Sequence, residues 1–115
     1  MRSIPRPLKP EERALIAYLW EVNECSNALP PELLVEELPD GGMGSLSFLS
    51  QKLERKYGGE AGSCGFYDED GMQVWAGLIL DQDGDLFELD LWKVDFSPLI
   101  KIPEPSSFFD KRGPV

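Results

Sequence analysis

The sequence predicts an α+β fold, with one N-terminal amphipathic helix packed on an antiparallel β-sheet of about five strands that ends in a three-stranded meander. Three observations predict it. Apolar residues recur at helical spacing in 10–25, residues 87–92 alternate between the two faces of a strand, and Asp-Gly pairs at 70–71 and 83–84 mark hairpin turns. Because 115 residues, 42% of them hydrophobic, suffice to bury one core, we expect a single domain over 10–102.

The predicted helix spans 10–25. Proline suits the first helical position, and Glu11 and Glu12 follow Pro10 where the helix dipole favours anions. Its apolar stripe recurs every three or four residues and consists of Leu15, Ile16, Tyr18, Leu19, Trp20 and Val22. The preceding residues 1–9 carry Pro5, Pro7 and three basic side chains, which indicates an extended basic arm.

Residues 32–38 fit either a short helix or a strand, and we favour the strand. The sequence Asp-Gly-Gly-Met-Gly at 40–44 then predicts a tight turn into a strand at 45–49. Three glycines also suit a phosphate-binding loop, but no Gly-Lys-Ser/Thr follows them. We therefore expect these glycines to form a tight turn. Residues 50–57 are polar and basic and fit a single helical turn or an exposed loop.

The meander has a definite predicted register. If each Asp-Gly pair forms a two-residue turn, Leu80 faces Phe87 and Leu78 faces Leu89 on the side that the helix covers. Tyr67 then lies opposite Val74. The second face of the sheet is predicted to carry Cys64, Phe66, Trp75, Gly77, Glu88, Asp90 and Trp92. Residues 103–115 are expected to form a loosely ordered C-terminal tail.

The charge is strongly acidic: 21 acidic against 11 basic residues give a formal net charge of -10. Nucleic acid is excluded as an expected partner, because its binding relies on Lys and Arg. Nine acidic residues lie between 68 and 95, where Lys93 is the only basic residue of that stretch. Such acidity serves solubility, or it attracts a basic protein partner.

The sequence offers no metal or cofactor motif. It has no histidine and two cysteines, Cys25 and Cys64, which is too few for a zinc site and leaves a single Cys25–Cys64 bridge open. The stretch 81–85 alternates acids like a calcium loop, but its glycine and its twelfth residue do not fit an EF-hand, so we expect a hairpin tip. No leader-like or membrane-spanning run is present, so we expect no membrane association and a cytoplasmic location.

The second face of the sheet is the candidate site. Trp75 and Trp92 flank the gap above Gly77, with Glu88, Asp90 and Phe66 beside them, which predicts an aromatic, acidic surface for a partner or ligand. The alternative is an ordinary cross-strand Trp pair with solvated acids. Glu88 and Asp90 would lie about 6–7 Å apart, but no nucleophile or histidine supports an acid/base pair, so we expect no catalytic residues and no enzyme.

Residues 40–46 and 86–99 also carry a resemblance. Their sequences, Asp-Gly-Gly-Met-Gly-Ser-Leu and Leu-Phe-Glu-Leu-Asp-Leu-Trp-Lys-Val-Asp-Phe-Ser-Pro-Leu, resemble the signature of a family of small bacterial proteins of unknown function, which implies no activity. In size, acidity and its lone sheet the chain is also similar to immunity proteins that neutralise toxins. The leading hypothesis is a non-enzymatic protein that binds a basic partner. The alternatives are a small-ligand module, or less readily an enzyme, on the Trp75/Trp92 face, and a homodimer through that face.

Overall fold

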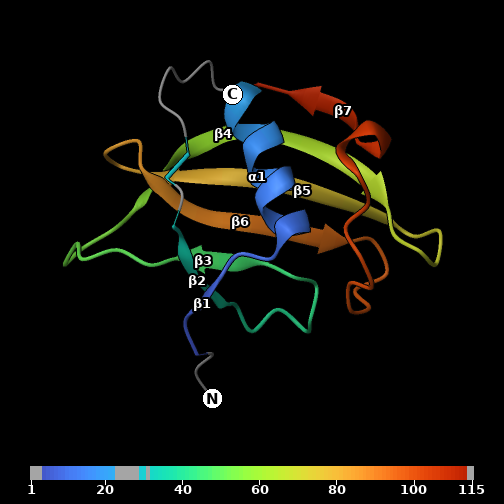
Figure 1. Ribbon diagram of the computed structural model, residues 1–115, viewed down its shortest axis with the longest axis horizontal. Coiled ribbons are helices and arrows are strands. Elements are labelled where there is room, and N and C mark those ends of the chain that lie inside the picture. The colour runs from blue at the N-terminus through green and yellow to red at the C-terminus, as the bar shows by residue number, and fades with distance from the viewer. Residues whose placement is uncertain (1–3, 23–28, 31, 114–115) are drawn as a thin grey trace.

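The computed structural model describes residues 4–22, 29–30 and 32–113 (Figure 1). One α-helix, α1 (Pro10–Val22), lies across one face of an antiparallel sheet. The strands are β1 (Arg6–Pro7), β2 (Leu34–Glu37), β3 (Leu46–Phe48), β4 (Tyr57–Tyr67), β5 (Gln73–Asp81), β6 (Leu86–Lys93) and β7 (Phe109–Arg112), with a 3-10 turn, η1 (Pro105–Ser107), before β7. The spatial order is β1-β2-β3-β6-β5-β4-β7. The predicted α+β class is therefore confirmed.

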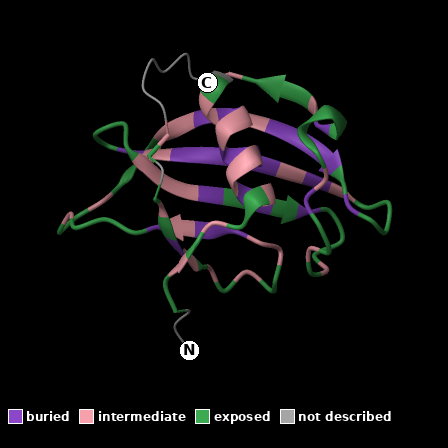
Figure 2. Cartoon of the chain, viewed as in Figure 1, coloured by how far each residue is buried: buried purple, intermediate pink, exposed green. Residues whose placement is uncertain are grey.

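The core fills the space between α1 and the sheet. Leu15, Ile16 and Leu19 of the helix have no exposed surface and face buried residues of the central strands (Figure 2). The helix begins at Pro10, as predicted, and the carboxylate of Glu12 accepts the Lys9 amide at 2.8 Å, which caps the first turn. The last predicted helical residues, 23–25, lie outside the described residues.

The sheet has seven strands rather than about five. The five expected strands are β2 to β6, and each end of the described chain adds one more. In the predicted N-terminal arm, Arg6 and Pro7 pair with Val35 and Leu34. Proline has no amide hydrogen to donate, which suits this edge position. At the other end, residues 109–112 of the expected loose tail pair with β4.

Residues 34–48 form the predicted hairpin, because β2 and β3 pair antiparallel. The loop between them is organised by Asp40, whose two carboxylate oxygens accept the amides of Met43 and Ser45 at 3.0 and 2.9 Å. The loop's own carboxylate thus takes two of the amides that a phosphate cradle would offer. Gly41, Gly42 and Gly44 all have positive φ, between 78° and 100°, as a tight turn requires.

The predicted register of β5 and β6 is correct over most of its length. Trp75 pairs with Trp92 and Ile79 with Glu88, as the alternation implies. The prediction for Leu80 was wrong, since Leu80 pairs with Leu86 and a β-bulge lies between these pairs. Phe87 is the extra residue of the bulge. Its ring lies beneath the Arg55 guanidinium, 4.9 Å from the ring centroid, instead of in the core.

The predicted register of β4 and β5 was wrong by one residue. The turn is a three-residue loop, 69–71, closed by the Asp68 amide on the Met72 carbonyl, with Gly71 at φ 81°. Phe66 therefore pairs with Val74, and Tyr67 with Gln73. Because side chains alternate along a strand, this one-residue shift turns the side chains of residues 62–67 to the other face.

Cys64 lies in the core as a result of this shift, as a fully buried side chain that forms no disulfide with a described residue. The possible Cys25–Cys64 bridge involves Cys25, which lies outside the described residues. Burial raises the pKa of the Cys64 thiol to about 12. We expect native Cys64 in a Cys25→Ser background to react with iodoacetamide at pH 8 at least ~100-fold more slowly than the same protein in guanidinium, because the thiolate is the reacting species. Mass spectrometry of the alkylated protein measures both rates, and equal rates would contradict the buried placement.

Candidate interaction surface

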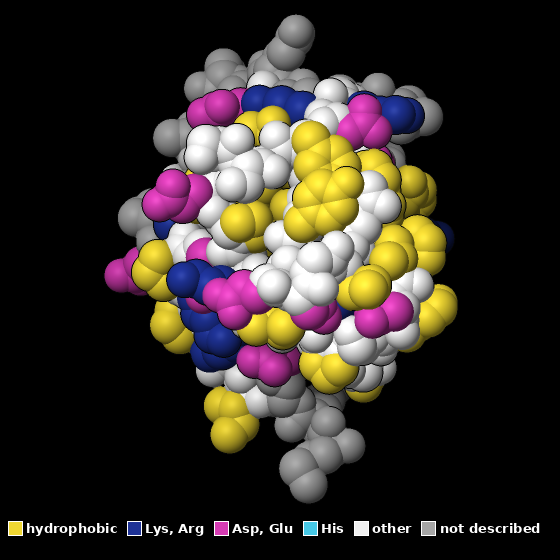
Figure 3. All heavy atoms as spheres, turned by 90° about the vertical axis from the view of Figure 1, so that its right-hand side faces the viewer, with side chains coloured by type: hydrophobic (Ala, Val, Ile, Leu, Met, Phe, Trp, Pro, Cys, Tyr) yellow, Lys and Arg dark blue, Asp and Glu magenta, His cyan; other side chains and the backbone are white. Residues whose placement is uncertain are grey.

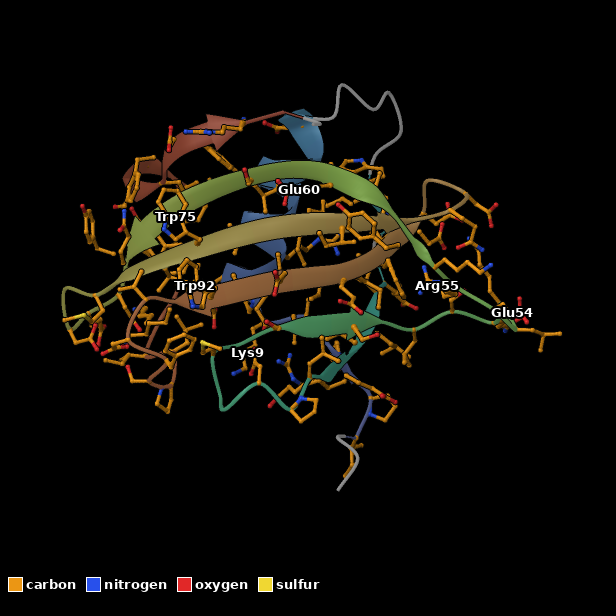
Figure 4. The ribbon with its side chains drawn as sticks, turned by 180° about the vertical axis from the view of Figure 1, so that it is seen from behind. Lys9, Glu54, Arg55, Glu60, Trp75 and Trp92 are labelled. Carbon is orange, nitrogen blue, oxygen red and sulfur yellow. The ribbon has the colours of Figure 1, made fainter. Side chains whose placement is uncertain are left out.

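The sheet face opposite α1, here called the open face, is not covered by a helix of the described chain. Figure 4 shows it from behind, with Trp75 on β5, Trp92 on β6 and Glu60 on β4. Four of the five predicted site residues, Trp75, Glu88, Asp90 and Trp92, point to this face, because their strand neighbours Ala76, Leu89 and Leu91 are buried beneath α1.

Phe66 does not belong to this surface. It has no exposed area and lies in the core, where its ring is 5.8 Å from that of Phe108. The sequence prediction placed it on the open face because it assumed a two-residue turn at 70–71. The observed register puts Ser63 and Gly65 there instead.

The depression expected above Gly77 is filled by a residue that the sequence did not indicate. A Cβ atom added to Gly77 would lie 2.9 Å from Oε2 of Glu60, so the Glu60 carboxylate lies directly over the glycine. The absence of a side chain at position 77 makes room for it. Register irregularities in β4 between Tyr57 and Gly62 hid this placement from a strict alternation.

Three carboxylates thus share the open face: Glu60, Glu88 and Asp90. Within the described residues none of them forms a hydrogen bond or ion pair through its side chain. Partial burial raises the pKa of Glu88, and the neighbouring charge of Asp90 raises it further. The positive charge of Arg55 opposes these two effects but does not outweigh them, so the pKa of Glu88 stays raised.

Aromatic rings border these carboxylates at one end of the sheet. Trp92 is 45% exposed and its ring centroid lies 6.2 Å from that of Phe96, while Trp75 contacts the Phe109 ring edge-on at 5.7 Å. Figure 3 shows this end of the sheet, where apolar side chains gather. The exposed large apolar residues at the ends of β4 and β6 and in the segments that follow these strands are Tyr67, Met72, Trp92, Val94, Phe96 and Ile100.

The aspartates at the two hairpin tips of the meander form ion pairs within the molecule. Lys52 places its ammonium among the carboxylates of Asp81, Asp83 and Asp85, at 2.6, 3.0 and 2.7 Å. Arg55 adds a second ion pair to Asp81 at 2.9 Å. Burial raises the pKa of Asp81, but its bonds to Lys52, to loop amides and to Arg55 hold that pKa well below its usual range.

A second cluster of ion pairs lies at the other end of β5. The buried ammonium of Lys93 contacts Asp68 at 2.8 Å and Asp70 at 2.7 Å. The Asp68 carboxylate also accepts the amides of Ile100 and Lys101 at 2.8 and 2.9 Å. Although burial opposes ionisation, Lys93 and these amides lower the pKa of Asp68. The hairpin tips at 68–72 and 81–85 are therefore internal ion clusters.

A cavity of about 170 Å³ lies away from the open face, between the start of α1, the 40–46 loop and residues 99–102. Its lining includes Lys9, Glu11 and Lys101 and contains none of the predicted site residues. In the described part of the chain, no group of three or more His, Cys, Asp and Glu side chains is arranged to hold a metal ion.

A family model described as Domain of unknown function (DUF6984) matches residues 5–103. The chain belongs to the DUF6984 family. No curated protein and no solved structure matches it. The DUF6984 match includes α1 and the strands β1 to β6, and it ends before η1 and β7. No helix in the described part of this DUF6984 protein is long and apolar enough to cross a membrane.

Within the DUF6984 domain, the two segments that carried the resemblance pack on each other. Ser45 Oγ accepts the Leu91 amide at 2.9 Å and donates to the Leu91 carbonyl at 3.2 Å. The Leu99 amide donates to the Gly42 carbonyl, and Gly44 lies so close to Leu91 and Leu99 that a Cβ there would be 2.9 Å from each. These inward contacts build the fold, while Glu88, Asp90 and Trp92 of the same segment face outward.

Proposed function

We propose that this protein is a non-enzymatic interaction protein that binds a basic protein partner through the open face. One observation carries the proposal: within the described residues the carboxylates of Glu60, Glu88 and Asp90 form no ion pair, whereas the aspartates of both hairpin tips are ion-paired to Lys52, Arg55 and Lys93. These three carboxylates lie close together on one surface, which supports the binding of a positively charged group there.

The electrostatics of this surface favour a cation. The raised pKa of Glu88 reflects its partial burial and its repulsion with Asp90. A bound Arg or Lys side chain replaces that repulsion with attraction, and association is accelerated by the acidic field. Such binding weakens as salt is added, because exposed charges are screened.

The indole rings of Trp75 and Trp92 provide the apolar contact area for a bound partner. Trp and Arg are over-represented among the residues that dominate binding energies, and a guanidinium stacks favourably on an indole face. Trp92 is exposed beside Asp90, and Trp75 pairs with it across the strands. A basic toxin, which this chain would neutralise as an immunity protein does, is one partner that fits this chemistry.

A small-ligand module is the competing function. It requires an open depression between Trp75 and Trp92, and the Glu60 carboxylate covers Gly77 there. We therefore favour the extended protein surface over a ligand pocket. A ligand of this face would raise the melting temperature of the pure protein in a metabolite screen.

The experiment begins by capturing partners from lysate on the immobilised protein at low and high salt. The affinity of the captured protein for purified variants then decides. We expect Glu88→Lys/Asp90→Lys to weaken binding about 100-fold and Trp92→Ala about 10-fold or more, with the domain still folded. Glu21→Lys/Glu54→Lys, which changes the net charge equally at exposed positions elsewhere, should change affinity less than about threefold.

Unchanged affinity in both the charge-reversed and the Trp92→Ala variants would sink the proposal. If the open-face and the control charge reversals weaken the affinity equally, the binding is a non-specific attraction to the acidic protein. A column that retains no basic protein at low salt, together with a ligand-induced rise in melting temperature, would favour the small-ligand module.

A further inference from the structure

The C-terminal strand, β7, lies at one edge of the sheet. It lies beyond the DUF6984 match, which ends at residue 103, and it follows a link that contains Pro103 and Pro105. Its register with β4 consists of two pairs, Ser63 with Arg112 and Gly65 with Phe109, with an irregularity between them. Two register pairs therefore join residues 104–113, here called the strap, to β4.

Side chains of the strap fill a slot on the family domain. Phe108 lies between Tyr18 of α1 and Phe66 of β4, with ring centroids 5.0 and 5.8 Å away. Phe109 lies against Tyr67 and Trp75, at 5.2 and 5.7 Å. The residues of the family domain that contact these two rings, Tyr18, Gly65, Phe66, Tyr67 and Trp75, are here called the strand slot.

Gly65 gives the strand slot its depth. A Cβ atom at this position would lie 2.7 Å from the Phe109 ring and 2.9 Å from that of Trp75. The aromatic ring thus rests directly on the backbone of β4, as it can only on a glycine. A larger side chain at position 65 would fill the place of the ring.

The rest of the strap is held by charge and contains a residue with positive φ. The Lys111 ammonium lies 4.0 Å from the centroid of the Tyr18 ring, in a cation–π contact. Asp110 has φ 58°, a left-handed conformation that is uncommon outside glycine, although aspartate adopts it more readily than most residues. A sparsely paired edge strand with strong aromatic contacts has the character of a bound peptide rather than of a central strand.

We propose that the β4 edge and the strand slot form a strand-acceptor site, which the strap occupies in cis. The partner that it fits is an extended segment with two adjacent aromatic residues followed by basic residues, the pattern of Phe108, Phe109, Lys111 and Arg112. Such a segment adds a strand to the sheet edge and inserts its aromatic pair, a known mode of peptide recognition. This site shares Trp75 with the open face but uses none of its carboxylates, and it does not depend on the proposed function.

The direct test uses a fluorescent peptide of residues 104–113 and the full chain with Phe108→Ser/Phe109→Ser, which frees the slot. We expect the peptide to bind this variant about 100-fold more tightly than the wild-type chain, where the tethered strap competes at a high effective concentration. Adding Gly65→Val to the variant, or replacing both Phe residues of the peptide by Ser, should abolish binding. A folded variant that does not bind the peptide, or that binds it equally well with Gly65→Val, would overturn the proposal.

Hydrogen exchange on the wild-type chain tests the same proposal without a variant. Amides of β7 should exchange at least ~10-fold faster than those of β5 and β6, because the strap opens without global unfolding. Equal protection of all three strands would overturn the proposal, even if the double variant does not fold. A wild-type dimer that Phe108→Ser/Phe109→Ser dissociates would overturn the partner assignment and make a second copy the occupant.

Discussion

Asp68→Ala is expected to lower the free energy of unfolding by about 3–5 kcal/mol, because removing one member of a buried ion pair leaves the other charge uncompensated. In this variant the buried Lys93 ammonium keeps only Asp70 and the Pro98 carbonyl. The amides of Ile100 and Lys101 also lose their acceptor. Unfolding in guanidinium, followed by tryptophan fluorescence, measures the change.

Asp70→Ala is the matched control, since it removes the more exposed partner of the same ammonium. It should cost about 1 kcal/mol or less. A further Lys93→Met substitution in Asp68→Ala should restore part of the loss by removing the unpaired charge. Equal losses in the two single variants would show that burial of the Asp68–Lys93 pair does not set its contribution.

The second large effect is expected at Asp81. Asp81→Asn should cost about 2–3 kcal/mol at pH 7, since hydrogen bonds to a charged group are worth more than neutral ones. The carboxylate holds Lys52 and Arg55 through one oxygen and the amides of Asp83 and Asp85 through the other. Asp83→Asn, which loses only an exposed contact to Lys52, should cost less than about 1 kcal/mol.

The Asp81 effect has a defined pH dependence. The pKa of Asp81 in the folded protein lies below the unfolded value of about 3.9. Its stabilisation is therefore fully present above the unfolded pKa and is lost as the pH falls toward the folded pKa. The stability difference between wild type and Asp81→Asn should be constant from pH 7 to pH 5 and shrink toward pH 2. A difference that stays the same down to pH 2 would contradict this assignment.

Much of the fold can be predicted from the sequence, because the helix start and the strand alternation depend on neighbouring residues only. Pro10 with the two glutamates marks the helix start, and the alternation of 87–92 marks β6 and its register with β5. These features need only the geometry of one helix and one strand pair. The four open-face residues Trp75, Glu88, Asp90 and Trp92 follow from the same alternation.

The misplacement of Phe66 has a specific cause. Both Asp-Gly pairs indicated two-residue turns, but each glycine ends a three-residue loop, with φ 81° at Gly71 and 82° at Gly84. After Gly84 the bulge at Phe87 restores the expected register, whereas nothing compensates the first loop. Asp68 and Asp81, which precede the two loops, accept amides within those loops and so stabilise the longer form. The Asp-Gly pairs alone do not reveal these contacts.

Long-range contacts account for the remaining differences. Lys52 and Arg55 form ion pairs with the acidic stretch, in which only Lys93 was expected to oppose the acids. They do so because the loop at 50–56 packs against the hairpin tip at 81–85. Glu60 reaches Gly77 through an irregular part of β4, and Phe109 reaches Trp75 from beyond the family domain. Charge and aromatic character mark such residues as candidates, but their partners depend on the tertiary arrangement.

The two ion clusters at the ends of β5 have a consequence for how the protein folds. Each hairpin tip receives its counter-charge from another part of the chain: Asp68 from Lys93, 25 residues later, and Asp81 from Lys52, 29 residues earlier. An isolated hairpin would form its turn with the aspartate unneutralised and gain little from closing. Turn formation is thus coupled to the docking of distant segments, which favours a cooperative, all-or-none transition. Intermediates that contain only part of the meander are correspondingly disfavoured.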